Sequence, residues 1–198
     1  MGKSPERPGP PSSLTSGPYT YRIDGEAVPG VTRLAAIFGL PPEQDDALRT
    51  YIGRRLSGAG RGRLPPPGDC RPWAGSVERF LSEHRLVPIP LNVPLRCEAR
   101  GVRFAGTPDF LGSFDGHLSI LEWTCASRMQ KTMTGARLSG YWELCAANDI
   151  FPEALYGVQF LPDGVYRIYP AGMKADDLFL CLDVYRAVHR KHPEGAIQ

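Results

Sequence analysis

Two acidic residues in the middle of the chain have the types and spacing of a divalent-metal site. Asp109 and Glu122 flank a segment in which Asp115-Gly116 predicts a tight turn between two apolar, β-prone stretches. Both acids lie at nearly equal distances from this turn, so we expect them to face each other across paired strands. Two buried carboxylates that close need a proton or a cation, and Mg²⁺ or Mn²⁺ prefers oxygen ligands. The alternative is a hairpin with two solvated acids on its polar face.

Hydrophobic periodicity predicts the elements that must position these acids. We place the central hairpin within residues 104–124. Further strands are expected in a hairpin over 19–28, at a sheet edge over 89–95 and in a hairpin over 155–169. Helices are expected from Thr32 to Phe38, over 45–56 and 73–84, from Thr132 or Thr134 to about 148, and over 175–189. This order predicts an α/β fold with a central mixed β-sheet flanked by helices.

Length and composition are those of one globular domain. The chain has 198 residues, of which 1–18 are dominated by Pro, Gly and Ser, so we expect a disordered tail followed by a single domain over 19–198. A net charge of +2 is too small by itself to indicate nucleic-acid binding. Five scattered cysteines without a C-x-x-C pair indicate neither a disulfide framework nor a zinc site. No apolar run approaches a membrane span and no signal segment opens the chain, so we expect no membrane association and a soluble, cytoplasmic protein.

The order and spacing of three short motifs resemble the PD-(D/E)XK nuclease superfamily, especially its phage-type and RecB-like exonuclease members. The segment GTPD at 106–109 matches the first motif, and LEWT at 121–124 matches the frame of the second. The segment RLSGY at 137–141 falls where the family carries a helix motif of the form Gln-x-x-x-Tyr. The resemblance covers nearly the whole chain after residue 18 and implies a restriction-endonuclease-like core.

The resemblance also implies an activity, namely Mg²⁺- or Mn²⁺-dependent hydrolysis of phosphodiester bonds in DNA. Asp109 and Glu122 would hold the metal ion together with the backbone carbonyl of Trp123, and the ion would activate a water molecule. A lysine two residues after the second acid would stabilise the transition state. Thr124 stands in place of that lysine, and a hydroxyl group supplies no positive charge.

Three other departures make the motif degenerate. Asn92 stands for the family's glutamate on the preceding strand, and Arg137 stands for the glutamine of the helix motif. No histidine lies between residues 45 and 64, where the family often has one in its first long helix. The chain is therefore also compatible with a catalytically inactive homologue that serves as a nucleic-acid-binding or protein-interaction module. The retained Asp109 and Glu122 favour the active enzyme.

Basic side chains near the motifs are candidates for catalysis and for phosphate binding. Lys131, at the start of the helix behind the Glu122 strand, is our candidate for the missing catalytic cation, and a solvated lysine is the alternative. For Arg137 the alternative is a salt bridge to Glu122 or Asp109 that puts a guanidinium in the metal position. The residues expected to contact nucleic acid are Arg54, Arg55, Arg61, Arg63, Arg128, Arg137 and Tyr141. The sequence gives neither the oligomeric state nor the strandedness of the substrate.

Overall fold

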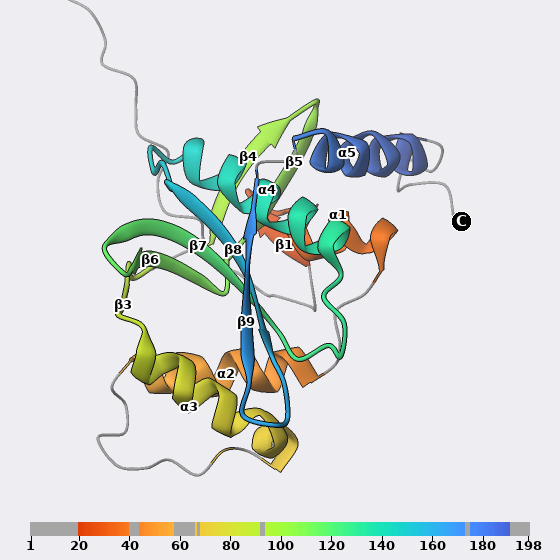
Figure 1. Ribbon diagram of the computed structural model, residues 1–198. Helices are drawn as coiled ribbons and strands as arrows, with labels where there is room; N and C mark the ends of the chain where they lie inside the picture. Colours follow the sequence, from red (N-terminus) through yellow and green to blue (C-terminus); the bar gives the residue numbers. More distant parts are fainter. Residues whose placement is uncertain are drawn as a thin grey trace, which may run out of the picture.

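A mixed β-sheet and five α-helices make up an α/β fold in the part of the chain that the structure describes (Figure 1). This computed structural model describes residues 20–39, 44–57, 66, 68–91, 94–172 and 175–190. The strands are β1 (Thr20–Ile23), β2 (Glu26–Pro29), β3 (Leu86–Pro88), β4 (Leu95–Ala99), β5 (Val102–Gly106), β6 (Phe110–Phe114), β7 (His117–Thr124), β8 (Ala154–Phe160) and β9 (Tyr166–Ala171). The helices are α1 (Val31–Ala35), α2 (Gln44–Leu56), α3 (Ala74–Glu83), α4 (Lys131–Ala146) and α5 (Ala175–Arg190), with short 3₁₀ helices η1 (Ala36–Phe38) and η2 (Gly68–Trp73).

The central sheet has five strands in the order β3-β6-β7-β8-β9. Its β6–β7 hairpin turns at Asp115-Gly116, where both residues have positive φ angles, as the tight turn predicted for this dipeptide requires. Strands β7 and β8 run parallel, and the other neighbours run antiparallel. A parallel pair needs a long crossover, which α4 provides here. The prediction of a mixed sheet flanked by helices is confirmed.

Each face of this sheet packs against its own group of helices. Along β7, Ile120 contributes to a core with α1, α4 and α5, whereas Leu121 and Trp123 contribute to a core with α2 and α3. Figure 1 shows α4 and α5 on one side of the sheet and α2 and α3 on the other. Successive side chains of a strand point to opposite faces, so Glu122, between Leu121 and Trp123, points toward α4. The strand thereby places one acidic side chain inside an otherwise apolar layer.

Two predicted strand positions need correction. Residues 104–106 belong to β5, which pairs with β4 in a separate two-stranded sheet and not with the central hairpin. A single strand over 89–95 is also wrong, because β3 ends at Pro88 and β4 begins at Leu95. Prolines at 90 and 94 explain this interruption, since a proline nitrogen cannot donate to a β-ladder. The edge of the sheet next to this segment is formed instead by β3, which was not predicted.

Helix positions follow the predictions within a few residues at their ends. The helix expected from Thr32 begins one residue earlier, at Val31, with Gly30 as its N-cap, and continues as η1. Helix α4 begins at Lys131, before either predicted threonine. The predicted hairpins over 19–28 and 155–169 form as β1–β2 and β8–β9, while the predicted tail over 1–18 lies outside the described residues.

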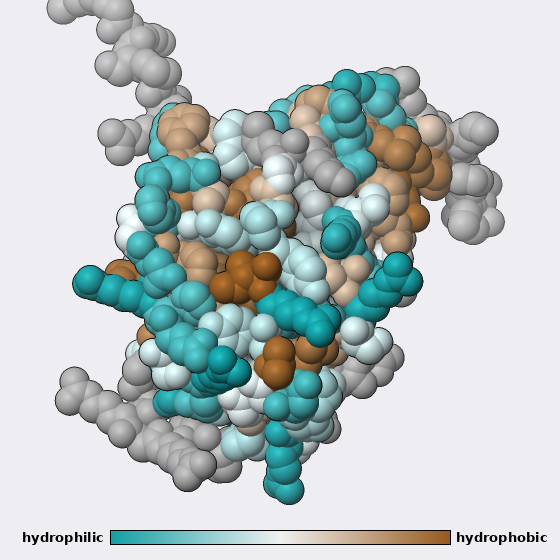
Figure 2. All heavy atoms as spheres, in the orientation of Figure 1, coloured by the Kyte–Doolittle hydropathy of each residue, from teal (hydrophilic) through white to brown (hydrophobic). Residues whose placement is uncertain are grey.

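Hydrophobic residues are distributed over the surface in small groups in the view of Figure 2, separated by hydrophilic ones. One brown group lies over α5, where Leu180 and Val188 are exposed. None of the described helices has both the length and the apolar character needed to cross a membrane.

A glycine in β6 allows the edge strand to approach closely, and this leads to a prediction about stability. A Cβ atom at Gly112 would lie 2.2 Å from the Val87 carbonyl oxygen and 2.8 Å from the Pro88 Cα atom, both in the β3 backbone. We expect Gly112→Ala to separate β3 from β6 and to lower the midpoint of urea unfolding. The matched control is Gly53→Ala in α2, where nothing lies within 4 Å of the added atom. This control is expected to raise stability by up to about 1 kcal/mol. Equal effects of the two variants would contradict the close approach.

Candidate functional site: a buried cluster of two acids and two arginines

The two acids singled out from the sequence meet on the α4 side of the sheet. Glu122 lies in β7, and Asp109 immediately precedes β6. The β6–β7 ladder ends at the pair Phe110–Leu121, and Asp109 and Glu122 are the next residues of the two segments. The prediction of two acids on paired strands holds for Glu122 in β7 but not for Asp109, which lies one residue before β6. The alternative of two solvated acids does not apply to Glu122, which is 2% exposed.

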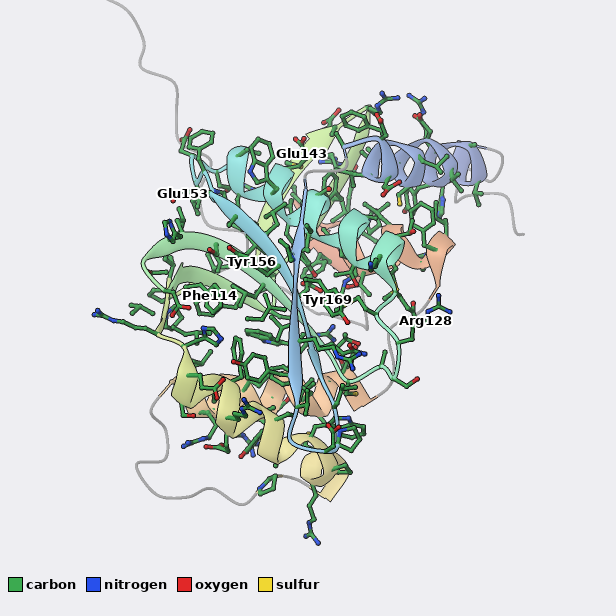
Figure 3. All side chains as sticks on the ribbon, viewed as in Figure 1. Phe114, Arg128, Glu143, Glu153, Tyr156 and Tyr169 are labelled. Atoms are coloured by element: carbon green, nitrogen blue, oxygen red, sulfur yellow. The ribbon has the colours of Figure 1, made fainter. Side chains whose placement is uncertain are left out.

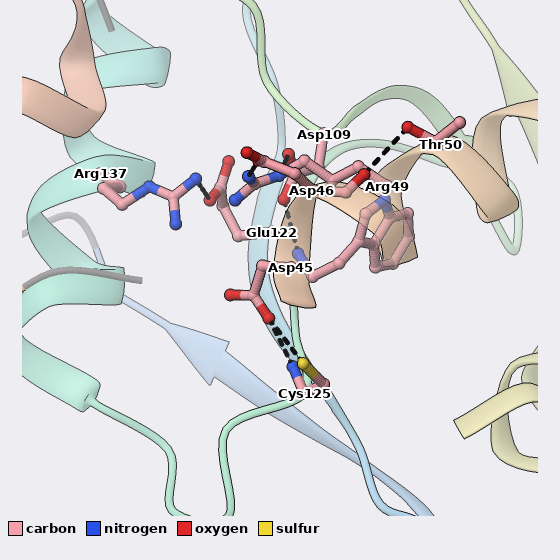
Figure 4. Close-up of polar contacts among 9 residues, drawn as sticks. Asp45, Asp46, Arg49, Thr50, Asp109, Glu122, Cys125 and Arg137 are labelled. Atoms are coloured by element: carbon pink, nitrogen blue, oxygen red, sulfur yellow. Dashed lines mark hydrogen bonds and ion pairs between the residues drawn. The ribbon is translucent and has the colours of Figure 1, made fainter. Parts of the chain in front are cut away.

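Glu122 forms an ion pair with an arginine from the helix that covers it. The Arg137 Nη2 atom of α4 lies 2.5 Å from Glu122 Oε2, and Arg137 is 3% exposed (Figure 4). This is the salt bridge that the sequence suggested as the alternative role of Arg137. Removing two charges from water is costly, and their close approach offsets that cost only while both partners are present.

Asp109 is neutralised by a second arginine, from α2. The Arg49 Nε atom donates to Asp109 Oδ1, and the other carboxylate oxygen accepts a hydrogen bond of 2.8 Å from the Trp123 backbone N–H. Arg49 also donates to Asp46, at 2.6 Å, on its own helix. Figure 4 shows Arg49 beside both Asp109 and Glu122. We call the four side chains of Arg49, Asp109, Glu122 and Arg137 the charge cluster; its formal charges balance.

Burial sets the ionisation behaviour of the charge cluster. Burial raises the pKa of Glu122 above its usual value, and Asp109 raises it further, while Arg137 and Arg49 oppose the rise. For Arg137 and Arg49, burial alone would lower the pKa, but the neighbouring carboxylates more than compensate and raise it. Both guanidinium groups therefore stay charged at any pH at which the protein folds.

A third acid lies next to the charge cluster. Asp45, in the first turn of α2, is 1% exposed and accepts hydrogen bonds from the Cys125 backbone N–H at 2.8 Å and from the Cys125 Sγ at 3.1 Å. Burial raises the pKa of Asp45, and these hydrogen bonds oppose the rise. Asp45 thus holds Cys125, the residue that follows the end of β7 at Thr124, against α2.

The position of the family's lysine carries no cation in this structure. The Thr124 hydroxyl accepts a hydrogen bond of 3.1 Å from the Ala126 backbone N–H, so it is occupied in shaping the chain after β7. Lys131, our candidate for a replacement, lies elsewhere: its Nζ atom is 5.9 Å from the centre of the Tyr169 ring. No ion pair joins Lys131 to Asp109 or Glu122 among the described residues.

The charge cluster does not fit a divalent metal ion. Asp109 and Glu122 supply the oxygen ligands that Mg²⁺ or Mn²⁺ would need, but a guanidinium group already lies against each carboxylate. A metal ion added there would be repelled by both arginines in a site with little water to screen the charges. The described residues also contain no group of three or more His, Cys, Asp or Glu side chains that could hold a metal ion.

The residues expected to contact nucleic acid divide into buried and exposed groups. Arg137 and Tyr141 lie on the buried side of α4, and burial raises the pKa of the Tyr141 hydroxyl, so these two residues belong to the interior around Glu122. Arg54 and Arg128 are exposed. Arg55 makes two hydrogen bonds to Glu78, at 2.7 and 2.6 Å, which leaves it partly neutralised. Arg61, Arg63 and Asn92 lie outside the described residues.

Sequence reasoning missed Arg49 and Asp45. Arg49 is 60 residues from Asp109, and Asp45 is 80 residues from Cys125, so neither contact has a local pattern. One signal was available: both residues lie four positions apart on a predicted helix whose other face is apolar, so they share a side of that helix. An acid and an arginine on the same side of a packed helix are candidates for a buried pair.

Comparison with known proteins does not assign the chain to a family. No protein-family model matches it, and no curated protein matches it. The resemblance to the PD-(D/E)XK superfamily therefore stays a prediction.

Proposed function

We propose that this protein is a non-catalytic relative of the PD-(D/E)XK nucleases that binds nucleic acid without cutting it. The observation that carries the proposal is the ion pair between Arg137 and Glu122, in which both side chains are nearly inaccessible to solvent. Arg137 takes the place of the glutamine in the family's helix motif and supplies the positive charge that a metal ion would otherwise supply. A carboxylate held in this way is not free to bind Mg²⁺.

The missing lysine supports the same proposal. In the family pattern a cation two residues after the second acid stabilises the charge that develops on the phosphate. Thr124 cannot do so, and Lys131 lies against Tyr169 and not against the acids. The two functions of the family's site, metal binding and charge stabilisation, are therefore both absent from the arrangement of Asp109, Glu122 and Thr124.

Exposed cations support a role in binding phosphate groups. Arg54 in α2, Arg128 in the loop before α4 and Lys131 at the start of α4 are all exposed. Figure 3 shows Arg128 on the loop that leads into α4. Each cation that contacts a phosphate releases counterions, which makes binding strongly dependent on salt.

The proposal predicts binding without cleavage. With Mg²⁺ or Mn²⁺, wild-type protein should leave labelled single- and double-stranded DNA intact, while its affinity falls steeply from low to physiological salt. Arg54→Ala should weaken binding more than Arg55→Ala, because Glu78 already neutralises Arg55. Gel electrophoresis and fluorescence anisotropy measure the two properties.

A second candidate function is metal-dependent cleavage, and one observation favours it: Asp109 and Glu122 meet in one cluster, as the active family site requires. The same assay separates the candidates when it includes Asp109→Ala. Cleavage that persists in Asp109→Ala comes from a contaminant. Cleavage by wild type that Asp109→Ala abolishes would contradict the non-catalytic proposal.

A further inference from the structure

A pocket large enough for a small ligand lies beside the charge cluster. It has a volume of about 300 Å³ and lies between the first turns of α4 and the last residues of β9. Met129, Lys131, Thr134, Gly157 and Tyr169 contribute to its walls. This volume is at the lower end of the range for small-molecule sites.

The pocket adjoins the charge cluster through a glycine. Gly157 in β8 pairs with Glu122 in the parallel β7–β8 register, so the two residues are neighbours on the same face of the sheet. A Cβ atom at Gly157 would lie 3.0 Å from Thr134 Cγ2 and 3.2 Å from Met129 Cε. A side chain at this position would therefore crowd the side of the pocket that is formed by α4 and its preceding loop.

The walls of the pocket are suited to an anion with an aromatic group. Among the lining residues that the structure describes, Lys131 is the one cation and none is acidic. No ion pair between Lys131 and an acid occurs among the residues that the structure describes. Lys131 therefore brings an uncompensated positive charge to the rim, which favours a phosphate group.

Tyr169 supplies an aromatic surface in a fixed orientation. Its hydroxyl donates a hydrogen bond of 3.1 Å to Gln159 Oε1, and Gln159 Nε2 in turn donates to the Ala126 carbonyl at 2.7 Å. These contacts anchor the outer end of the ring, which is half-buried. Tyr169 belongs to β9, a strand at the edge of the central sheet, and Figure 3 labels it there. A nucleobase can stack on such a ring whatever its sequence.

We propose that this pocket binds one nucleotide unit of single-stranded nucleic acid, with the base against Tyr169 and the phosphate at Lys131. The proposal rests on the nucleic-acid-binding function above and specifies its ligand. Single strands are favoured over duplexes, because stacked and paired bases in a duplex do not present a free face to an aromatic side chain.

The test measures fluorescence anisotropy of a labelled single-stranded oligonucleotide and of a hairpin duplex at low salt, for wild type and four variants. Tyr169→Ala should weaken single-strand binding by about ten-fold, whereas Tyr169→Phe, which keeps the ring but loses the hydrogen bond to Gln159, should retain most of the binding. Lys131→Ala should also weaken binding and should reduce its salt dependence. Arg22→Ala, at an exposed cation on β1 away from the pocket, should bind as wild type does. Circular dichroism checks that each variant is folded, and Lys131→Ala, at an exposed residue, tests the pocket independently of any folding defect in Tyr169→Ala.

Each remaining outcome has a separate meaning. If wild type binds neither oligonucleotide, the proposed function is wrong and this proposal fails with it. If wild type binds but Tyr169→Ala and Lys131→Ala bind equally well, nucleic acid binds elsewhere and only the pocket assignment fails. Tighter binding to the duplex than to the single strand would also overturn the assignment to single strands. So would a protein that binds a free mononucleotide but does not bind the oligonucleotide.

Discussion

Arg137→Met is expected to lower the free energy of unfolding by about 3–5 kcal/mol at about pH 8, a large part of the total stability of a domain of this size. The substitution leaves the Glu122 carboxylate buried without its closest cation. Burial already raises the pKa of Glu122, and Arg137 opposes that rise, so its removal raises the pKa further. The folded variant then binds a proton that the unfolded chain releases at lower pH. The contribution of Glu122 to the stability of the variant is therefore fully present below the pKa that Glu122 has in the unfolded chain. It is lost as pH rises through the higher pKa that Glu122 has in the folded variant.

The decisive comparison is a double-mutant cycle measured by urea unfolding at about pH 5 and about pH 8. The cost of Arg137→Met should shrink at the lower pH, where Glu122 takes up a proton. Glu122→Leu combined with Arg137→Met should recover most of the loss at both pH values, because apolar residues of similar size can replace a buried ion pair at little cost. Arg137→Lys, which keeps the charge, should cost less than Arg137→Met. Equal costs at the two pH values would contradict the ion pair.

The elements around the charge cluster could be predicted because each has a local signal. Asp115-Gly116 defines the β6–β7 turn and with it the register that brings Asp109 opposite Glu122. Apolar residues predict α4, and the resemblance to the family's helix motif, not a local pattern, is what placed Arg137 on the side of this helix toward the acids. From the turn and this resemblance together the Arg137–Glu122 salt bridge could be inferred as one of two roles for the arginine.

The remaining contacts depend on how distant elements pack, which no local pattern records. Arg49 reaches Asp109 because α2 packs across the end of the β6–β7 hairpin, and nothing in the sequence of either element specifies that crossing. Lys131 was expected near the acids because it follows the Glu122 strand in sequence. Helix α4 starts at Lys131, and the Lys131 side chain lies over Tyr169 on the edge strand β9 instead.

Electrostatics gives one reason for the combination of residues in the charge cluster. Two acids buried side by side repel each other, so a fold that contains them needs a proton, a metal ion or basic side chains between them. Relative to the family pattern, this chain lacks a cation at Thr124 and has one at Arg137. The cluster contains as many positive as negative groups, which satisfies the requirement without a metal ion.

This reasoning leads to the prediction with the largest change in binding. If the arginines occupy the place of a metal ion, Arg49→Gln combined with Arg137→Gln should create a site for Mn²⁺ that wild type lacks. Removing both cations leaves Asp109 and Glu122 facing each other, and a divalent ion with oxygen ligands relieves their repulsion. The double variant should be less stable than wild type without metal, and Mn²⁺ should restore much of that loss.

The measurement is the shift in thermal unfolding with Mn²⁺ concentration, supported by calorimetric titration of the folded protein. A free metal concentration of about 100 times the dissociation constant stabilises a protein by about 2.7 kcal/mol, whereas wild type should show no shift. Adding Asp109→Asn to the double variant should abolish the effect, because one of the two carboxylates is lost. Adding Asp46→Asn should preserve it, because Asp46 is an exposed partner of Arg49 outside the charge cluster. A double variant that gains no affinity for Mn²⁺ would contradict the idea that the two arginines occupy the place of a metal ion.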